Sequence, residues 1–71
     1  MKNAIKFVRV YNRYGTQYAD IVYRSNRVRA EQFENIPKTA ADFIANGTAR
    51  EQYDRTLKRT EIIYTGGVKN V

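Results

Sequence analysis

The sequence predicts a small single domain of the α+β class, in which an antiparallel sheet carries two short helices on one face. Three observations predict it: two strand-like segments around a glycine turn, a middle with helix-capping signals, and a final isoleucine-rich segment. The expected order is β-β-α-α-β. With 71 residues the chain makes one domain (1–71), near the lower limit for folding without disulfides or metals.

The first two strands are expected over Ala4–Asn12 and Gln17–Arg24, joined by a turn in which Gly15 is free to take a positive φ. A loop of two or four residues puts even positions of the first strand and odd positions of the second on one face. That face is apolar and suits a core: Val8, Val10, Ala19, Ile21 and Tyr23. The other face holds Arg9, Tyr11, Arg13, Tyr18 and Arg24, with Asp20 and Phe7 among them. A three-residue loop would mix the two faces, so burial of one apolar face favours the unmixed register.

The middle of the chain is expected to be helical in short pieces. A helical turn or two over Ala30–Asn35 stops before Pro37, because the residue before proline avoids helical ψ. Thr39 is expected to cap a helix over Ala40–Asn46, which Gly47 ends in the left-handed conformation.

A second capping pattern, Thr48 with Glu51, predicts a helix running to about Lys58. Its apolar stripe is Ala49, Tyr53 and Leu57, and its other face carries opposite charges four residues apart. Thr60–Thr65 is expected to be the last strand, and residues 68–71 a loose tail.

Composition excludes several function classes. The chain has no cysteine and no histidine, which removes disulfides, thiolate chemistry, zinc sites and the usual general base near neutral pH. Its seven acidic residues are scattered rather than paired. We therefore expect no enzyme, no metal and no cofactor, and a reducing, cytoplasmic setting. No apolar run is long enough to span a membrane.

Positive charge is concentrated at the start of the chain. Residues 1–29 carry seven Lys or Arg residues against the single acid Asp20, a net charge of +6. Residues 30–54 carry −3 and residues 55–71 carry +3, so the whole chain carries +6. Basic residues interleaved with tyrosines in one strand-like stretch indicate a functional surface.

Single-stranded nucleic acid, RNA or DNA, is the first partner that this surface predicts. Arginines neutralise phosphates, and tyrosines stack on bases without regard to sequence. The candidate binding residues share this chemistry and lie on or beside the hairpin: Arg9, Tyr11, Arg13, Tyr14, Tyr18, Arg24, Arg27 and Arg29.

A purely structural role for the same residues stays open. Cross-strand pairs such as Tyr11–Tyr18 and Arg9–Asp20 stabilise a hairpin without any ligand. The basic run Arg24–Arg29 is equally typical of a solvated loop. A helix-turn-helix over Thr39–Arg59 is disfavoured, because its second helix would present self-paired charges to DNA.

The alternative function is a protein-interaction module or inhibitor that docks its basic hairpin on an acidic partner protein. Tyrosine and arginine also dominate protein-protein contacts, so composition does not separate the two functions. In size, lack of cysteine and basic charge, the chain is similar to small accessory proteins of phages and mobile elements. That resemblance implies a protein that binds and inhibits a host or rival macromolecule. The thin core expected of so short a chain also favours a homodimer.

Overall fold

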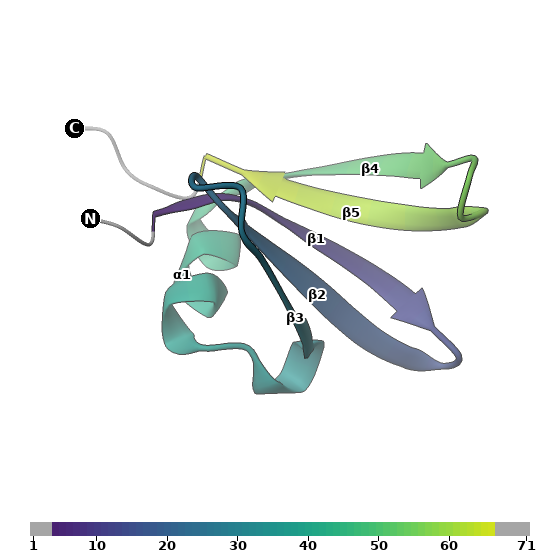
Figure 1. Cartoon of the computed structure of the whole chain (residues 1–71), viewed down its shortest axis with the longest axis horizontal. Helices are drawn as coiled ribbons and strands as arrows, with labels where there is room; N and C mark the ends of the chain where they lie inside the picture. Colours follow the sequence, from purple (N-terminus) through teal and green to yellow (C-terminus); the bar gives the residue numbers. More distant parts are fainter. Residues whose placement is uncertain (1–3, 67–71) are drawn as a thin grey trace.

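Residues 4–66 form a five-stranded antiparallel sheet with one α-helix packed on one face (Figure 1). The computed structural model describes residues 4–66, so the predicted tail at 68–71 lies outside the described residues. The sheet order is β3-β2-β1-β5-β4. In chain order the elements are β1 (Ile5–Arg13), β2 (Thr16–Tyr23), β3 (Val28–Gln32), the 3-10 turn η1 (Phe33–Asn35), α1 (Lys38–Asn46), β4 (Thr48–Asp54) and β5 (Arg59–Thr65).

The predicted N-terminal hairpin and its unmixed register are confirmed. A two-residue loop joins β1 to β2, and both of its residues, Tyr14 and Gly15, have positive φ (52° and 82°). That loop geometry matches the right-handed twist of paired strands. The pairs Val8–Ile21 and Val10–Ala19 then face the core from neighbouring strands.

The core lies between α1 and the middle of the sheet. Its buried residues are Ile5, Val8, Val10, Ala19, Ile21, Ala40 and Phe43. The helix packs on β1 and β5, and Figure 1 shows it on one side of the sheet, near the end where β1 begins. The expected helix over Ala40–Asn46 is therefore confirmed, although it begins at Lys38 after Pro37, and Thr39 does not cap it.

Gly47 ends α1 for a reason other than the one expected. Its φ is −95°, so the predicted left-handed exit is wrong. A Cβ built on Gly47 would lie 2.8 Å from the carbonyl oxygen of Thr65 and 2.9 Å from that of Phe43. Glycine is needed here because the end of the helix passes directly against β5.

The second predicted helix is wrong: Thr48–Asp54 forms β4, and residues 55–58 make the turn into β5. All seven residues of β4 pair with β5, from Thr48–Thr65 to Asp54–Arg59. The turn contains Lys58 at a φ of 53°, and the Asp54 carboxylate accepts the Leu57 backbone N–H at 2.9 Å. Pairing with β5 therefore overrides the local capping pattern.

A further strand stands where a basic loop and a helical turn were expected. Only residues 24–27 form the loop, and β3 continues from Val28 to Gln32 on the edge of the sheet beside β2. The expected helical turn is reduced to η1. In the part of the chain that the structure describes, the order is therefore β-β-β-α-β-β, with one helix where two were expected.

Candidate nucleic-acid interface

The sheet face opposite α1, which we call the open face, carries the Arg/Tyr side of the hairpin. Strand pairing aligns its side chains in rows across the sheet. One row runs Asp20, Arg9, Ile63 and Arg50, and the next runs Tyr18, Tyr11, Glu61 and Gln52. The sequence predicted that five residues would share this face: Arg9, Tyr11, Arg13, Tyr18 and Arg24. The first four do, but the prediction is wrong for Arg24, because β2 ends at Tyr23 and Arg24 lies in the loop that follows.

In the middle of the open face, however, these groups bind one another. Arg9 donates from Nε and Nη2 to one oxygen of Asp20, at 3.1 and 2.9 Å. The Tyr11 hydroxyl donates to the other Asp20 oxygen at 2.9 Å. One buried carboxylate thus accepts from two of the predicted binding residues.

Tyr11 is 7% exposed, so the expectation that it is displayed for stacking is wrong. Burial raises the pKa of its phenol, and the hydrogen bond to the Asp20 carboxylate raises it further. The Tyr18 ring lies beside it, with centroids 6.2 Å apart and planes 15° from parallel. The pairs Tyr11–Tyr18 and Arg9–Asp20 therefore have the structural role that the sequence left open.

Arg59 covers one face of the Tyr11 ring. Its guanidinium carbon lies 3.7 Å from the ring centroid, a cation–π contact. The same guanidinium donates to Glu61 at 2.9 Å, and Glu61 is only 2% exposed. The buried charge on β5 is therefore neutralised by its own strand, and the middle of the open face presents no surplus of positive charge.

Surplus positive charge lies instead where the two long hairpins turn. Because β5 runs antiparallel to β1, the β1–β2 loop and the β4–β5 turn lie at the same end of the sheet, which we call the tip end. Figure 1 shows the two hairpins diverging toward this end. The pairing of β1 with β5 covers only Val8–Tyr11, and beyond it each hairpin continues as a two-stranded ribbon.

The tip end combines exposed cations with exposed aromatic rings. Tyr14 is 96% exposed, and the Arg13 guanidinium lies 5.8 Å from its ring centroid and 5.9 Å from that of Tyr18. Arg55 and Lys58 are exposed in the opposite turn. Neither turn contains an acidic residue.

The remaining predicted residues lie at the other end of the sheet. Arg24 and Arg27 are exposed in the β2–β3 loop, where Lys6 donates to the Asn26 side chain at 3.2 Å. Arg29 lies on β3 and forms an ion pair with Glu31 at 2.9 Å, which raises its pKa. Since β1 has nine residues, the two ends are roughly 30 Å apart. The eight predicted residues therefore do not form a single patch.

Sequence reasoning missed the contribution of the β4–β5 turn. The helix that the sequence predicts to about Lys58 would put Arg55, Lys58 and Arg59 near its end, where its dipole favours cations. Their place at the tip end follows only from the pairing of β5 with β1, which joins residues about fifty positions apart. The one signal in the sequence is the isoleucine-rich segment Thr60–Thr65. A strand that is apolar on both faces lies in the middle of a sheet and needs a partner on each side.

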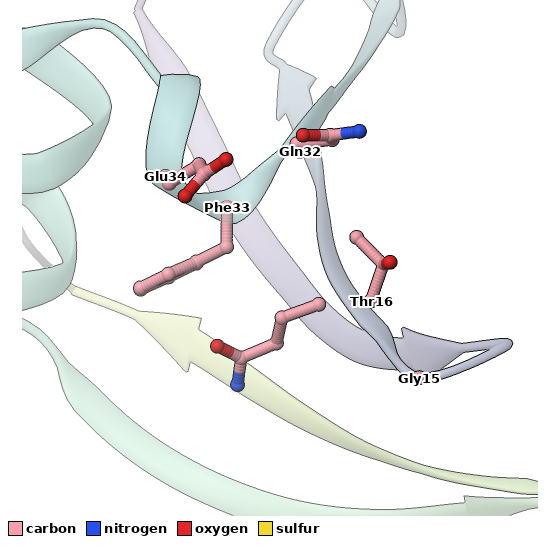
Figure 2. Close-up of a pocket in the computed structure, with 6 residues that line it drawn as sticks. Gly15, Thr16, Gln32, Phe33 and Glu34 are labelled. Atoms are coloured by element: carbon pink, nitrogen blue, oxygen red, sulfur yellow. The ribbon is translucent and has the colours of Figure 1, made fainter.

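A hollow of about 380 Å³ adjoins the tip end between the start of β2 and η1 (Figure 2). It is lined by Gly15, Thr16, Gln17, Gln32, Phe33 and Glu34. One aromatic ring and two amide side chains suit stacking and hydrogen bonding. A single carboxylate, that of Glu34, does not make an acid–base pair.

No protein-family model, curated protein or solved structure matches this chain. Within residues 4–66, no helix is long and apolar enough to cross a membrane. The same residues contain no group of three or more Asp or Glu side chains placed to hold a metal ion.

Proposed function

We propose that this protein binds single-stranded nucleic acid, RNA or DNA, at the tip end of its sheet. The observation that carries the proposal is the pairing of Tyr14, almost wholly exposed, with the Arg13 guanidinium beside it, opposite a second turn that bears Arg55 and Lys58. An exposed ring offers a stacking platform for any base, and the cations at the two turns offer contacts to the phosphates.

The tip end fits a single strand better than a duplex. Stacking on the exposed Tyr14 ring needs a base that is not already paired and stacked in a duplex, and a single strand offers such bases. Tyr18 adds a second, half-buried ring on the same hairpin. We expect weak base preference and a steep loss of affinity with salt, because phosphate contacts and stacking carry little sequence information.

The test compares variants at the two ends of the sheet. Tyr14→Asn removes the ring but keeps a residue that tolerates the left-handed conformation. Loss of one stacked base should weaken binding by about 1–3 kcal/mol, roughly 5- to 150-fold. Arg13→Ala should also weaken binding and lower the salt slope by about one.

Arg24→Ala is the matched control, because it removes an exposed arginine of similar chemistry from the opposite end. We expect it to change affinity less than twofold. Fluorescence anisotropy with labelled single-stranded DNA, single-stranded RNA and duplex, at two salt concentrations, measures all of these. An Arg24→Ala loss equal to that of Arg13→Ala would contradict a site at the tip end.

The alternative partner predicted from the sequence is an acidic protein surface. Leu57, 55% exposed in the β4–β5 turn, is the observation that favours it, since an apolar side chain adds nothing to phosphate binding. Absence of nucleic-acid binding at low salt, from a protein with a net charge of +6, would favour this partner.

A further inference from the structure

The outer edge of β4 is unusually open for a strand in so small a protein. Six of its seven residues are exposed and the seventh, Asp54, is partly buried. Among residues 4–66, the strand pairs only with β5, and α1 packs on β1 and β5. One side of the β4 backbone therefore has its N–H and C=O groups available to another strand.

The part of the β4–β5 hairpin next to its turn is also not paired with β1. The ladder between β5 and β1 ends at Glu61–Tyr11, so Arg59 and Thr60 continue with β4 alone. A two-stranded ribbon is marginally stable in water, and a third strand stabilises it. Tyr53, 60% exposed on this ribbon, has apolar area left to cover.

We infer that β4 pairs antiparallel with β4 of a second copy of this chain, joining the two sheets into one. In a symmetric antiparallel pair one residue lies opposite itself, because only then do facing side chains share a side of the sheet. The register is set by charge. Centring on Glu51 opposes two carboxylates, and centring on Arg50 opposes two guanidiniums, whereas centring on Gln52 puts Arg50 opposite Asp54 twice.

Complementarity in the Gln52 register extends beyond charge. The Gln52 amide faces its own copy; its Nε2 donates to Glu61 of the same chain at 3.5 Å, and its second N–H and its carbonyl oxygen are left for the partner. Within residues 4–66, Arg50 forms no ion pair in its own chain, so its guanidinium is available to the partner's carboxylate. Asp54 uses one oxygen, Oδ1, for the Leu57 N–H, which leaves Oδ2 for an arginine.

The other free edge, β3, suits a second copy less well. It is two residues shorter than β4, and its Arg29 is already bound to Glu31 of its own chain at 2.9 Å. A symmetric pair through β3 would have to break this ion pair in order to form the same Arg29–Glu31 contact between the two copies. This edge supplies the control for the experiment.

Sedimentation equilibrium of the full chain tests the interface. We expect reversible dimerisation at micromolar to submillimolar concentrations, since a single strand pair buries little area. Arg50→Asp and Asp54→Arg should each be monomeric under the same conditions, because each opposes like charges twice. Their equimolar mixture should recover the dimer, since both contacts are then between opposite charges.

The mixture also shows whether Asp54→Arg is monomeric only because it disrupts the turn, since an unfolded chain would not restore a dimer. Far-UV circular dichroism of each variant checks the fold. Arg29→Asp on β3 is the matched control and should leave the dimer intact. A wild-type chain that stays monomeric at millimolar concentration overturns the inference. So does a mixture that fails to dimerise, or a dimer that Arg29→Asp abolishes and Arg50→Asp does not.

Discussion

Asp20→Ala is the most informative single substitution, because Asp20 joins two of the predicted binding residues in the middle of the open face. Its carboxylate accepts the Tyr11 hydroxyl at 2.9 Å and two N–H groups of Arg9 at 3.1 and 2.9 Å. The substitution leaves a nearly buried phenol without an acceptor and a half-buried guanidinium without a counter-charge.

The expected cost follows from these contacts. A hydrogen bond to a charged group contributes about 1.5–3 kcal/mol, and the Tyr11 hydroxyl loses one. The Arg9 side chain is 29% exposed, so solvent screening limits its ion pair to about 0.5–1 kcal/mol. Together the free energy of unfolding should fall by about 2–4 kcal/mol, out of a total of about 4–10 kcal/mol for a chain of this length.

Urea unfolding at pH 7, followed by far-UV circular dichroism, measures this difference. Asp20→Asn keeps an oxygen that accepts the Tyr11 hydroxyl, so it should cost about 1 kcal/mol less than Asp20→Ala. Tyr11→Phe removes only the phenol contact, and the double variant should show coupling of at least about 0.5 kcal/mol. Additive effects, or a loss below about 0.5 kcal/mol for Asp20→Ala, would refute the idea that Asp20 holds Tyr11 and Arg9 together.

The same structure predicts the effects of two glycine substitutions and of a change in pH. Gly47→Ala forces a Cβ to within 3 Å of the carbonyl oxygens of Thr65 and Phe43, so it should cost about 2–3 kcal/mol and lower Tm by roughly 10 °C or more. Gly15→Ala has open space and only a positive φ to strain, so it should cost about 1 kcal/mol; the reverse ranking in thermal unfolding would contradict the close approach at Gly47. Because the pKa of Tyr11 is raised in the folded state, the Tyr11 phenol loses its proton at a lower pH in the unfolded chain than in the folded one. Its contribution to the free energy of unfolding is therefore present below about pH 10 and is lost as pH rises further. Urea unfolding between pH 8 and 11 should show a smaller loss in Tyr11→Phe than in the wild type, and identical losses would rule out that role.

The sequence predicted the N-terminal hairpin because its signals are local. Alternating apolar residues such as Val8 and Val10, and a glycine at the loop, specify strand, turn and register within about twenty residues. The helix ending at Asn46 and the strand around Ile62 and Ile63 were predicted for similar reasons.

The sequence did not predict the two edge strands, because neither strand has a buried face that would impose an alternation of apolar and polar residues. In β3 and β4 nearly every side chain is exposed, and β4 also carries the capping pattern Thr48 and Glu51. A helix there would have had to bury Tyr53 and Leu57, yet both are more than half exposed in the sheet. What decides the structure is pairing with β5, which no local pattern in Thr48–Asp54 encodes.

The candidate site differs from the predicted one for a related reason. A basic stretch of sequence forms a basic surface only if strand pairing does not bring acidic residues beside it. Counting along the chain gave +6 over residues 1–29, yet pairing with β2 places Asp20 beside Arg9. On β5, two residues apart, Arg59 and Glu61 neutralise each other in the same way. Charge that sits in the middle of a sheet meets partners from both neighbouring strands, whereas charge in a turn meets solvent. The surplus is therefore displayed at the ends of the hairpins, and within residues 4–66 the tip end is where a cation lies beside an almost fully exposed ring, that of Tyr14. A ligand that needs cations and a stacking surface together has its best contacts there.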